Sequence, residues 1–150
     1  SLVCNAAYIH SRVRFEEGAP ERDRPLAGQS PYLVNAGLFY QHDDKGISAS
    51  LLYNRIGKRI ESVGVPMQNQ NEDIPDIYEM PRNSLDLTFS KKIGKVVEIK
   101  AGIQDMLNSK IEYKQFVKLA DENGGKRERE QLVRSYRPGV DINVGVSLKF

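Results

Sequence analysis

Several features that would narrow the class of this protein are scarce in its sequence. Cys4 is the single cysteine, so it cannot form an internal disulfide and says little about the redox compartment. No apolar run approaches the roughly 18 residues of a transmembrane helix, so no such helix is expected. The net charge of +2 is small, and no basic stripe carries interleaved aromatic residues. We therefore expect no nucleic-acid partner.

The start of the chain is also uninformative about targeting. No signal peptide opens it, and it begins with Ser1 instead of methionine. A strand-like pattern begins almost at once. We therefore expect residues 1–150 to be the C-terminal portion of a longer protein.

The clearest pattern lies in residues 140–150, where apolar residues occupy every second position. These positions are Val140, Ile142, Val144, Val146, Leu148 and Phe150. A period of two predicts a β-strand with one apolar and one polar face. A strand of roughly 10 residues is longer than a usual soluble strand and has the length of a tilted membrane-spanning strand. An aromatic residue at its end is typical of the girdle at a membrane interface.

Five further segments alternate in a similar way, so we expect about six strands in all. These segments are residues 2–15, 32–41, 47–54, 84–90 and 97–104. In the first segment the expected apolar face consists of Ala7, Ile9, Val13 and Phe15. Long loops are expected at 16–30, 61–81 and 117–135, and short turns at 42–46 and 91–95. Outer-membrane barrels alternate long loops and short turns in this way.

The sequence therefore predicts an all-β fold: an antiparallel transmembrane β-barrel, of which this chain is a C-terminal fragment of about six strands. An unpaired backbone N–H or C=O is costly in hydrocarbon, so every strand edge in a membrane must be paired. About six strands cannot close around a wide lumen and would leave two open edges. The rest of the barrel is expected from an earlier part of the same chain or from further copies of it.

A set of short sequence motifs is distributed along almost the whole chain from Arg24 onward. The segments are residues 24–32 (RPLAGQSPY), 35–37 (NAG) with Tyr40, 52–60 (LYNRIGKRI), 79–82 (EMPR) leading to Leu85 and Asp86, 103–108 (IQDMLN) and 136–139 (YRPG). In this order they resemble the late strands of TonB-dependent outer-membrane receptors, especially those typical of Bacteroidetes. The resemblance specifies the family more closely than the substrate.

The resemblance implies a barrel of about 22 strands with a plugged lumen, in the outer membrane of a Gram-negative bacterium. It implies import of a scarce ligand, such as an iron chelate, cobalamin or an oligosaccharide, with energy supplied through TonB. The plug and the TonB-contacting segment belong to the family's N-terminal part, so no residue here is assigned to them. Other implied partners are outer-membrane lipid, the barrel-assembly machinery and a surface lipoprotein. No enzymatic activity and no cofactor are expected.

Two groups of residues are candidates for a functional role. The resemblance implies that the barrel-assembly machinery reads the final strand, through Val144, Val146, Leu148 and Phe150. Lipid contact alone would also explain these residues, and the two roles are compatible.

The second group consists of charged residues on the polar side of the strands, which are expected to face the lumen. They are Asp86, Glu98, Lys100, Asp141 and Lys149. They could guide a polar solute, or they could form a hydrated wall that bonds within itself and to the plug. The wall is favoured, because opposite charges in facing rows neutralise one another.

Two sets of residues suggest chemistry that we do not expect. His42, Asp43 and Asp44 are possible metal ligands, but they lie in a turn where Asp is favoured for backbone reasons. His10 and Ser11 are adjacent, and neighbouring strand residues point to opposite faces, so they form no catalytic dyad.

Two other classes of protein stay open. One is a different outer-membrane barrel, such as a passive pore or an adhesin. The other is a soluble β-barrel that binds a small ligand in its interior. The soluble fold would bury Leu87, Ile142 and Val146 in a packed core, whereas a membrane barrel would leave them uncovered.

Overall fold

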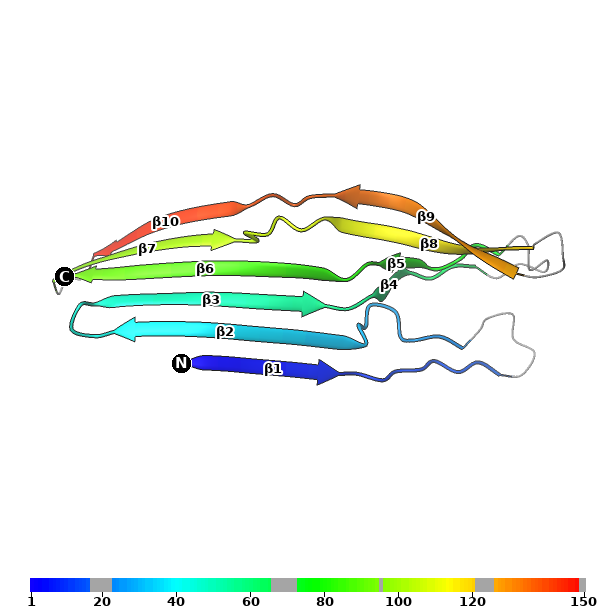
Figure 1. The fold of residues 1–150 in the computed structure, drawn as a ribbon, viewed down its shortest axis with the longest axis horizontal. Helices are drawn as coiled ribbons and strands as arrows, with labels where there is room; N and C mark the ends of the chain where they lie inside the picture. Colours follow the sequence, from blue (N-terminus) through cyan, green and yellow to red (C-terminus); the bar gives the residue numbers. More distant parts are fainter. Residues whose placement is uncertain (17–22, 66–72, 95, 121–125, 149–150) are drawn as a thin grey trace.

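The computed structural model of the chain describes residues 1–16, 23–65, 73–94, 96–120 and 126–148. These residues form ten strands in two antiparallel sheets (Figure 1). The larger sheet contains β1 (Leu2–Tyr8), β2 (Tyr32–His42), β3 (Ile47–Ile56), β6 (Arg82–Ile93), β7 (Val97–Gln104) and β10 (Asp141–Leu148). The smaller sheet contains β4 (Arg59–Ser62), β5 (Ile77–Glu79), β8 (Ile111–Ala120) and β9 (Lys126–Tyr136). None of the described segments is a helix with the length and apolarity of a membrane span.

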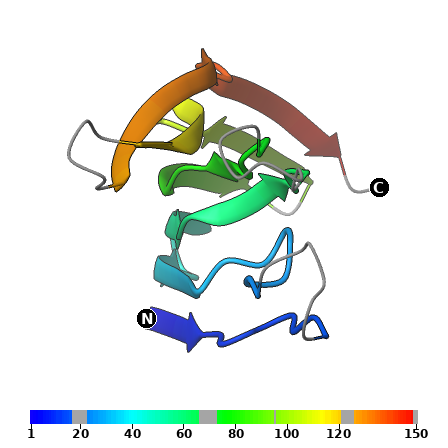
Figure 2. The same ribbon diagram turned by 90° about the vertical axis from the view of Figure 1, so that its right-hand side faces the viewer.

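The larger sheet has the strand order β1-β2-β3-β6-β7-β10, and every neighbouring pair is antiparallel. The smaller sheet, in the order β4-β5-β8-β9, lies beyond one end of the larger sheet (Figure 1). The turns that join β2 to β3 and β6 to β7 lie at the opposite end. Figure 2, viewed from the end of the smaller sheet, shows that the strands follow a curved surface.

The larger sheet contains the six strands predicted from the alternation of the sequence, so the all-β, antiparallel fold is confirmed. The predicted number of about six strands for the chain is wrong, because the described residues form ten. Within the described residues the sheet is open, with β1 and β10 as its edge strands, and no closed barrel is formed. The even number of strands makes the two edge strands antiparallel to each other. Further antiparallel strands could therefore continue the sheet from both edges without a change in pattern.

Two of the predicted long loops are wrong. Residues 61–81 contain β5 and the end of β4, and residues 117–135 contain most of the β8–β9 hairpin. These strands carry charged or polar side chains on both faces, as in the KREREQ stretch of β9. They therefore lack the apolar period of two by which a half-buried strand is recognised.

The prediction for the first strand is wrong in both length and face. β1 ends at Tyr8, and its register with β2 places Leu2, Cys4 and Ala6 on the apolar side of the sheet, so Ala7 lies on the polar side. A shift of one residue moves a whole strand to the other face. Pairing with β2 decides this register. The alternation of residues 2–15 is too weak to decide it.

A tight junction joins the two sheets between β7 and β8. Asp105 and Asn108 adopt left-handed backbone conformations, with φ of 50° and 44°. The Asp105 N–H donates to the Asp86 carboxylate of β6 over 2.8 Å. The Asn108 side-chain oxygen accepts from the Gly139 N–H over 3.1 Å, and its carbonyl accepts from Arg137 over 2.8 Å. The junction thus ties β6 to the connection between β9 and β10.

Almost nothing in the larger sheet is buried. Among the described residues, the buried apolar side chains are Ile60, Ile111 and Tyr113, all in strands of the smaller sheet. A soluble sheet normally covers one face with a second layer to form a core. Among the described residues, the larger sheet therefore has an apolar face and a polar face, and no second layer covers the apolar one.

A test of the connection between β4 and β5 concerns Gly64, beside the isolated bridge in which Val65 and Ile74 exchange two N–H···O bonds of 3.0 Å. A methyl group on Gly64 would lie 1.9 Å from the Ile74 carbonyl oxygen. We expect Gly64→Ala to break the bridge and to lower the free energy of unfolding by about 1–3 kcal/mol. Hydrogen exchange at the amides of Val65 and Ile74 should accelerate.

The matched control is Gly145→Ala on β10, where an added methyl group meets no atom within 4 Å. It should leave the exchange of both amides unchanged. Equal protection in the two variants would contradict the described backbone at Gly64.

Candidate functional site

One face of the larger sheet is apolar from edge to edge. In its central row, one residue of each strand lies in register with the next. The row consists of Leu2, Leu38, Leu51, Leu87, Ile103 and Ile142. All six are branched aliphatic residues, so cross-strand pairs build a continuous apolar band.

This apolar face is uncovered in the described structure. Leu2 and Ile142, at the two edges of the central row, are 69% and 70% exposed. Val144, Val146 and Leu148 follow on the same face of β10 and are all more than half exposed. The packed interior that a soluble ligand-binding barrel requires is therefore not present around these residues.

The band has tyrosines at both of its margins on β2. Tyr32 and Tyr40 lie on the apolar face, with Val34, Ala36 and Leu38 between them. At about 3.4 Å per residue, the two tyrosines are about 27 Å apart along the strand. With the tilt of about 40° usual for membrane strands, this separation becomes about 21 Å, close to the apolar band of about 25 Å in outer-membrane barrels.

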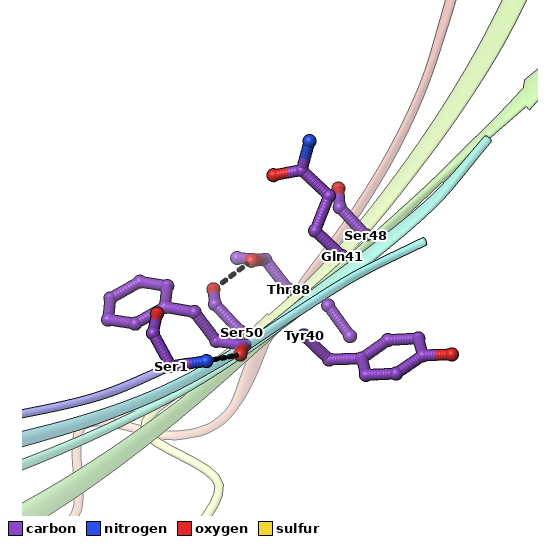
Figure 3. Close-up of a pocket in the computed structure, with 8 residues that line it drawn as sticks. Ser1, Tyr40, Gln41, Ser48, Ser50 and Thr88 are labelled. Carbon is purple, nitrogen blue, oxygen red and sulfur yellow. Dashed lines mark hydrogen bonds between the residues drawn. The ribbon is translucent and has the colours of Figure 1, made fainter. Parts of the chain in front are cut away.

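The opposite face carries small polar side chains that hydrogen-bond across the strands. Ser48 and Ser90 lie 2.7 Å apart, Ser50 and Thr88 lie 2.5 Å apart, and the Asn54 amide donates to Asn35. Figure 3 shows a pocket at this position, with Gln41, Ser48, Ser50 and Thr88 on one side of the sheet and Tyr40 pointing to the other side. This part of the polar face is thus rich in hydroxyl and amide groups.

Four of the five predicted lumen-facing residues are described, and all four lie on this polar face. Asp86 accepts the Asp105 N–H, Glu98 forms an ion pair with Lys100 at 3.5 Å, and Asp141 lies opposite Gln104. Lys149 is outside the described residues. Asp86, Glu98 and Lys100 thus have partners within the chain, and the four residues do not gather in one pocket. Whether they line a lumen stays a prediction.

Two glycines of the polar face make room for neighbouring side chains. A methyl group on Gly37 would lie 2.8 Å from the Phe39 ring and 3.0 Å from Leu52. A methyl group on Gly102 would lie 2.7 Å from the Asn143 side chain. Apolar Phe39 and Leu52 therefore lie close to Gly37. Val3, Leu33 and Ile56 are further apolar residues on this side of β1, β2 and β3.

The predicted assembly signal is described in part. Val144, Val146 and Leu148 lie side by side with β7 residues on the apolar face of β10, which is an edge strand of the described sheet. Phe150 is outside the described residues. Recognition of this strand by an assembly machinery stays a prediction.

The turn at His42 has an ordinary structural role. The Gly46 N–H donates to the Asp43 carbonyl over 2.9 Å, and the Asp43 carboxylate accepts from the Gln41 amide over 2.6 Å. Gly46 has a φ of 59°, which suits glycine. Across the described ranges, no three His, Cys, Asp or Glu side chains are grouped so that they could hold a metal ion.

The adjacent pair His10 and Ser11 lies outside the strands, beyond the end of β1. The Ser11 hydroxyl oxygen accepts the Leu26 N–H over 3.2 Å, and His10 is exposed. This contact gives Ser11 a structural partner on the connection to β2.

Cations and aromatic rings hold the smaller sheet together, and the sequence analysis missed these contacts. The Lys58 ammonium lies 4.0 Å from the ring centre of Tyr78 and 3.7 Å from that of Phe116. Burial lowers the pKa of Lys58, while Glu128 and Glu130 oppose the shift. Cation–π contacts of this kind contribute about 0.5–2 kcal/mol each.

A second stack lies on the other face of this sheet. The Arg134 guanidinium is 4.3 Å from the ring centre of Tyr113 and 5.6 Å from that of Tyr136, and the two rings are stacked. Next to Tyr113, Arg59 donates twice to Glu79, over 2.9 and 2.7 Å. The alternation of apolar and charged residues over residues 111–114 (IEYK) is the sequence signal that could have predicted this strand, although residues 115–117 interrupt it.

Comparisons with known proteins identify no family for this chain. A scan against protein-family models finds no match, and searches of curated proteins and of solved structures find none either.

The pH dependence of the smaller sheet can be tested at Glu112. Lys110 and Lys114 lie 3.1 and 3.3 Å from its carboxylate oxygens and lower the pKa of Glu112. Because the folded pKa is the lower one, this stabilisation is present above the unfolded value of about 4.3. It is lost as the pH falls through the folded value.

We expect Lys110→Gln to raise the pKa of Glu112, as followed by NMR titration of its side chain. Lys45→Gln, in the β2–β3 turn at the far end of the larger sheet, is the charge-matched control and should have no effect. An unchanged pKa in the Lys110 variant would contradict the ion pair.

Proposed function

We propose that this chain is part of the β-barrel of an outer-membrane active-transport receptor of the TonB-dependent class. In this proposal the apolar face contacts lipid and the polar face contacts an aqueous interior. The observation that carries it is the uncovered apolar band, which runs in register across all six strands of the larger sheet.

Solvation energetics favour lipid as the neighbour of this face. Burying one large aliphatic side chain contributes about 1.5–3 kcal/mol, and the band exposes many of them. Soluble monomers rarely leave a contiguous apolar patch of this extent in water. Contact with lipid removes all the apolar side chains of this face from water, while the hydroxyl-rich opposite face stays hydrated.

The two open edges are consistent with a larger closed barrel. In hydrocarbon, the free N–H and C=O groups of β1 and β10 must be paired. Their antiparallel relation allows closure by an even number of added antiparallel strands, from a longer polypeptide or from further copies of the chain. The proposed localisation is the outer membrane of a Gram-negative bacterium.

Active transport, as opposed to passive diffusion, rests on the resemblance of the sequence segments to TonB-dependent receptors. The proposed ligand is scarce: an iron chelate, cobalamin or an oligosaccharide. In this proposal the ligand is imported by binding and by movement of the plug, without enzymatic chemistry. Proposed partners are TonB and a plug domain, the barrel-assembly machinery, and a surface lipoprotein. A passive pore or an adhesin barrel would have the same lipid-facing sheet and is the alternative.

The lipid contact can be tested with the native cysteine. Cys4 lies on the apolar face and Asn5 on the polar face of β1. The whole barrel of which this chain is proposed to be part is used, because the edges of β1 and β10 would be unpaired in lipid if the chain were alone. It is inserted into lipid vesicles with an environment-sensitive fluorophore at Cys4, or at N5C in a C4S background. We expect the label at Cys4 to be shifted to the blue and quenched by brominated acyl chains. The label at position 5 should respond to a water-soluble quencher.

A second pair repeats the test on the other edge strand, with V144C and N143C in the C4S background. The register places Val144 on the apolar face and Asn143 on the polar face. Equal quenching by lipid at both positions of either pair would contradict the proposed two-faced sheet in the membrane.

Transport is tested in cells that produce the protein of which this chain is part. Uptake of labelled iron chelates, cobalamin and oligosaccharides is measured with and without the gene, and with the TonB system disrupted. We expect uptake of one ligand class to saturate as its concentration rises. This uptake should fall about tenfold or more when either the gene or the TonB system is lost. Uptake that rises linearly with concentration and is independent of TonB would favour the passive pore.

A further inference from the structure

The polar face of the larger sheet has two different halves. On β1, β2 and β3, all of whose residues the structure describes, the side chains of this face carry no charge. On β6, β7 and β10 the same face carries acidic and basic side chains, namely Arg82, Asp86, Lys92, Glu98, Lys100 and Asp141. The boundary between the two halves lies between the paired strands β3 and β6.

The uncharged half carries apolar side chains that the described residues leave partly uncovered. Leu33 lies opposite Ile56, while Leu52 and Phe39 both lie beside Gly37. Leu52 and Phe39 are 41% and 39% exposed. We call this group the β2–β3 patch: Leu33, Phe39, Leu52 and Ile56. It places apolar surface on the face that is otherwise hydrophilic.

A pair of side-chain amides lies in the middle of the β2–β3 patch. Asn35 and Asn54 lie opposite each other between the two apolar pairs, and the Asn54 amide donates to Asn35. An asparagine side chain has both an amide group and a carbonyl group. In the described structure, the side-chain amide of Asn35 and the side-chain carbonyl of Asn54 are left without a partner. They can bond to backbone groups of an element that lies on the patch.

The dimensions of the β2–β3 patch suit one element of secondary structure. From Leu33 to Phe39 the patch is about 20 Å long at about 3.4 Å per residue, and two neighbouring strands are about 10 Å wide. A helix with its side chains has a diameter of about 10 Å. The patch therefore fits a single helix or hairpin of a partner.

The charged half of the polar face is less suitable for such a partner. Glu98 pairs with Lys100 at 3.5 Å, and Arg82 pairs with Asp105 at 3.7 Å. An uncharged element laid over these groups would remove their water without supplying new partners, which is unfavourable. Apolar contact and charge together favour the β2–β3 patch over β6, β7 and β10.

We propose that the plug domain packs on the β2–β3 patch through one uncharged, amphipathic element and leaves the charged half of the polar face in contact with water. This inference rests on the proposed function, because a closed barrel encloses the polar face and only an element within the lumen can then cover the patch. The plug would thus lie against one side of the lumen, with a hydrated zone along β6, β7 and β10.

The experiment uses the complete receptor in lipid vesicles, without added ligand, and compares F39C with T88C in the C4S background. Phe39, Ser50 and Thr88 lie in one row across β2, β3 and β6, so the two test positions have the same depth in the barrel wall. Thr88 is exposed on the charged half. Each cysteine is labelled with a water-soluble maleimide, and its rate is normalised to the rate after denaturation. L52C is a second test position, in case F39C disturbs folding.

We expect F39C and L52C to be labelled about tenfold or more slowly than T88C, because a covered thiol reacts only when its cover opens. The described residues leave Phe39 and Leu52 exposed, so this protection would come from another part of the receptor. A benzophenone maleimide on the cysteine of L52C, followed by irradiation and mass spectrometry, identifies the covering segment. We expect crosslinks to the plug from L52C and none from T88C.

Three results would overturn the inference while leaving the proposed lipid contact intact. They are equal labelling of F39C, L52C and T88C, crosslinks from L52C to an outer loop of the barrel instead of the plug, and protection that appears only after ligand is added. In the last case the ligand, and not the plug, would be the occupant. Equal quenching by lipid at positions 4 and 5 would overturn the proposed function itself, and the inference with it.

Discussion

Cross-strand registry of aliphatic side chains is the constraint on which the rest of this structure depends. Because the six strands pair without a slip, Leu2, Leu38 and Ile142 belong to one row although they are far apart in sequence. A slip of one residue in any strand would place an aliphatic residue among serines and asparagines. The register thus separates an apolar surface from a hydroxyl-rich one within a single layer.

A single layer with two such different surfaces needs two different surroundings. The apolar side has no cover among the described residues, and the polar side satisfies its hydroxyl and amide groups by bonds such as Ser48 to Ser90. The proposed membrane environment supplies lipid on one side and water on the other. The same environment requires partners for the free edges of β1 and β10, which is why the chain is proposed as one part of a closed barrel.

The smaller sheet is stabilised by different forces. It buries Ile60 and Ile111. It also contains stacked and charged groups, such as Lys58 between Tyr78 and Phe116 and Lys114 between two carboxylates. Such contacts suit a sheet outside hydrocarbon, where hydrogen bonds and ion pairs compete with water. The junction at Asp105 and Asn108 joins the two sheets through hydrogen bonds from backbone N–H groups to the Asp86 and Asn108 side chains, which do not depend on apolar packing.

The sequence by itself determined the strands whose alternation is strong. The predictable strands were β2, β3, β6, β7 and β10. Within each of them, every second side chain is mainly apolar and so indicates which side of the strand is apolar. The tertiary structure decided what local alternation does not encode. The face of β1 follows from its pairing with β2, and the β8–β9 hairpin from ion pairs and stacking between strands. In each case the deciding contact joins residues of different strands, so no single stretch of the chain contains it.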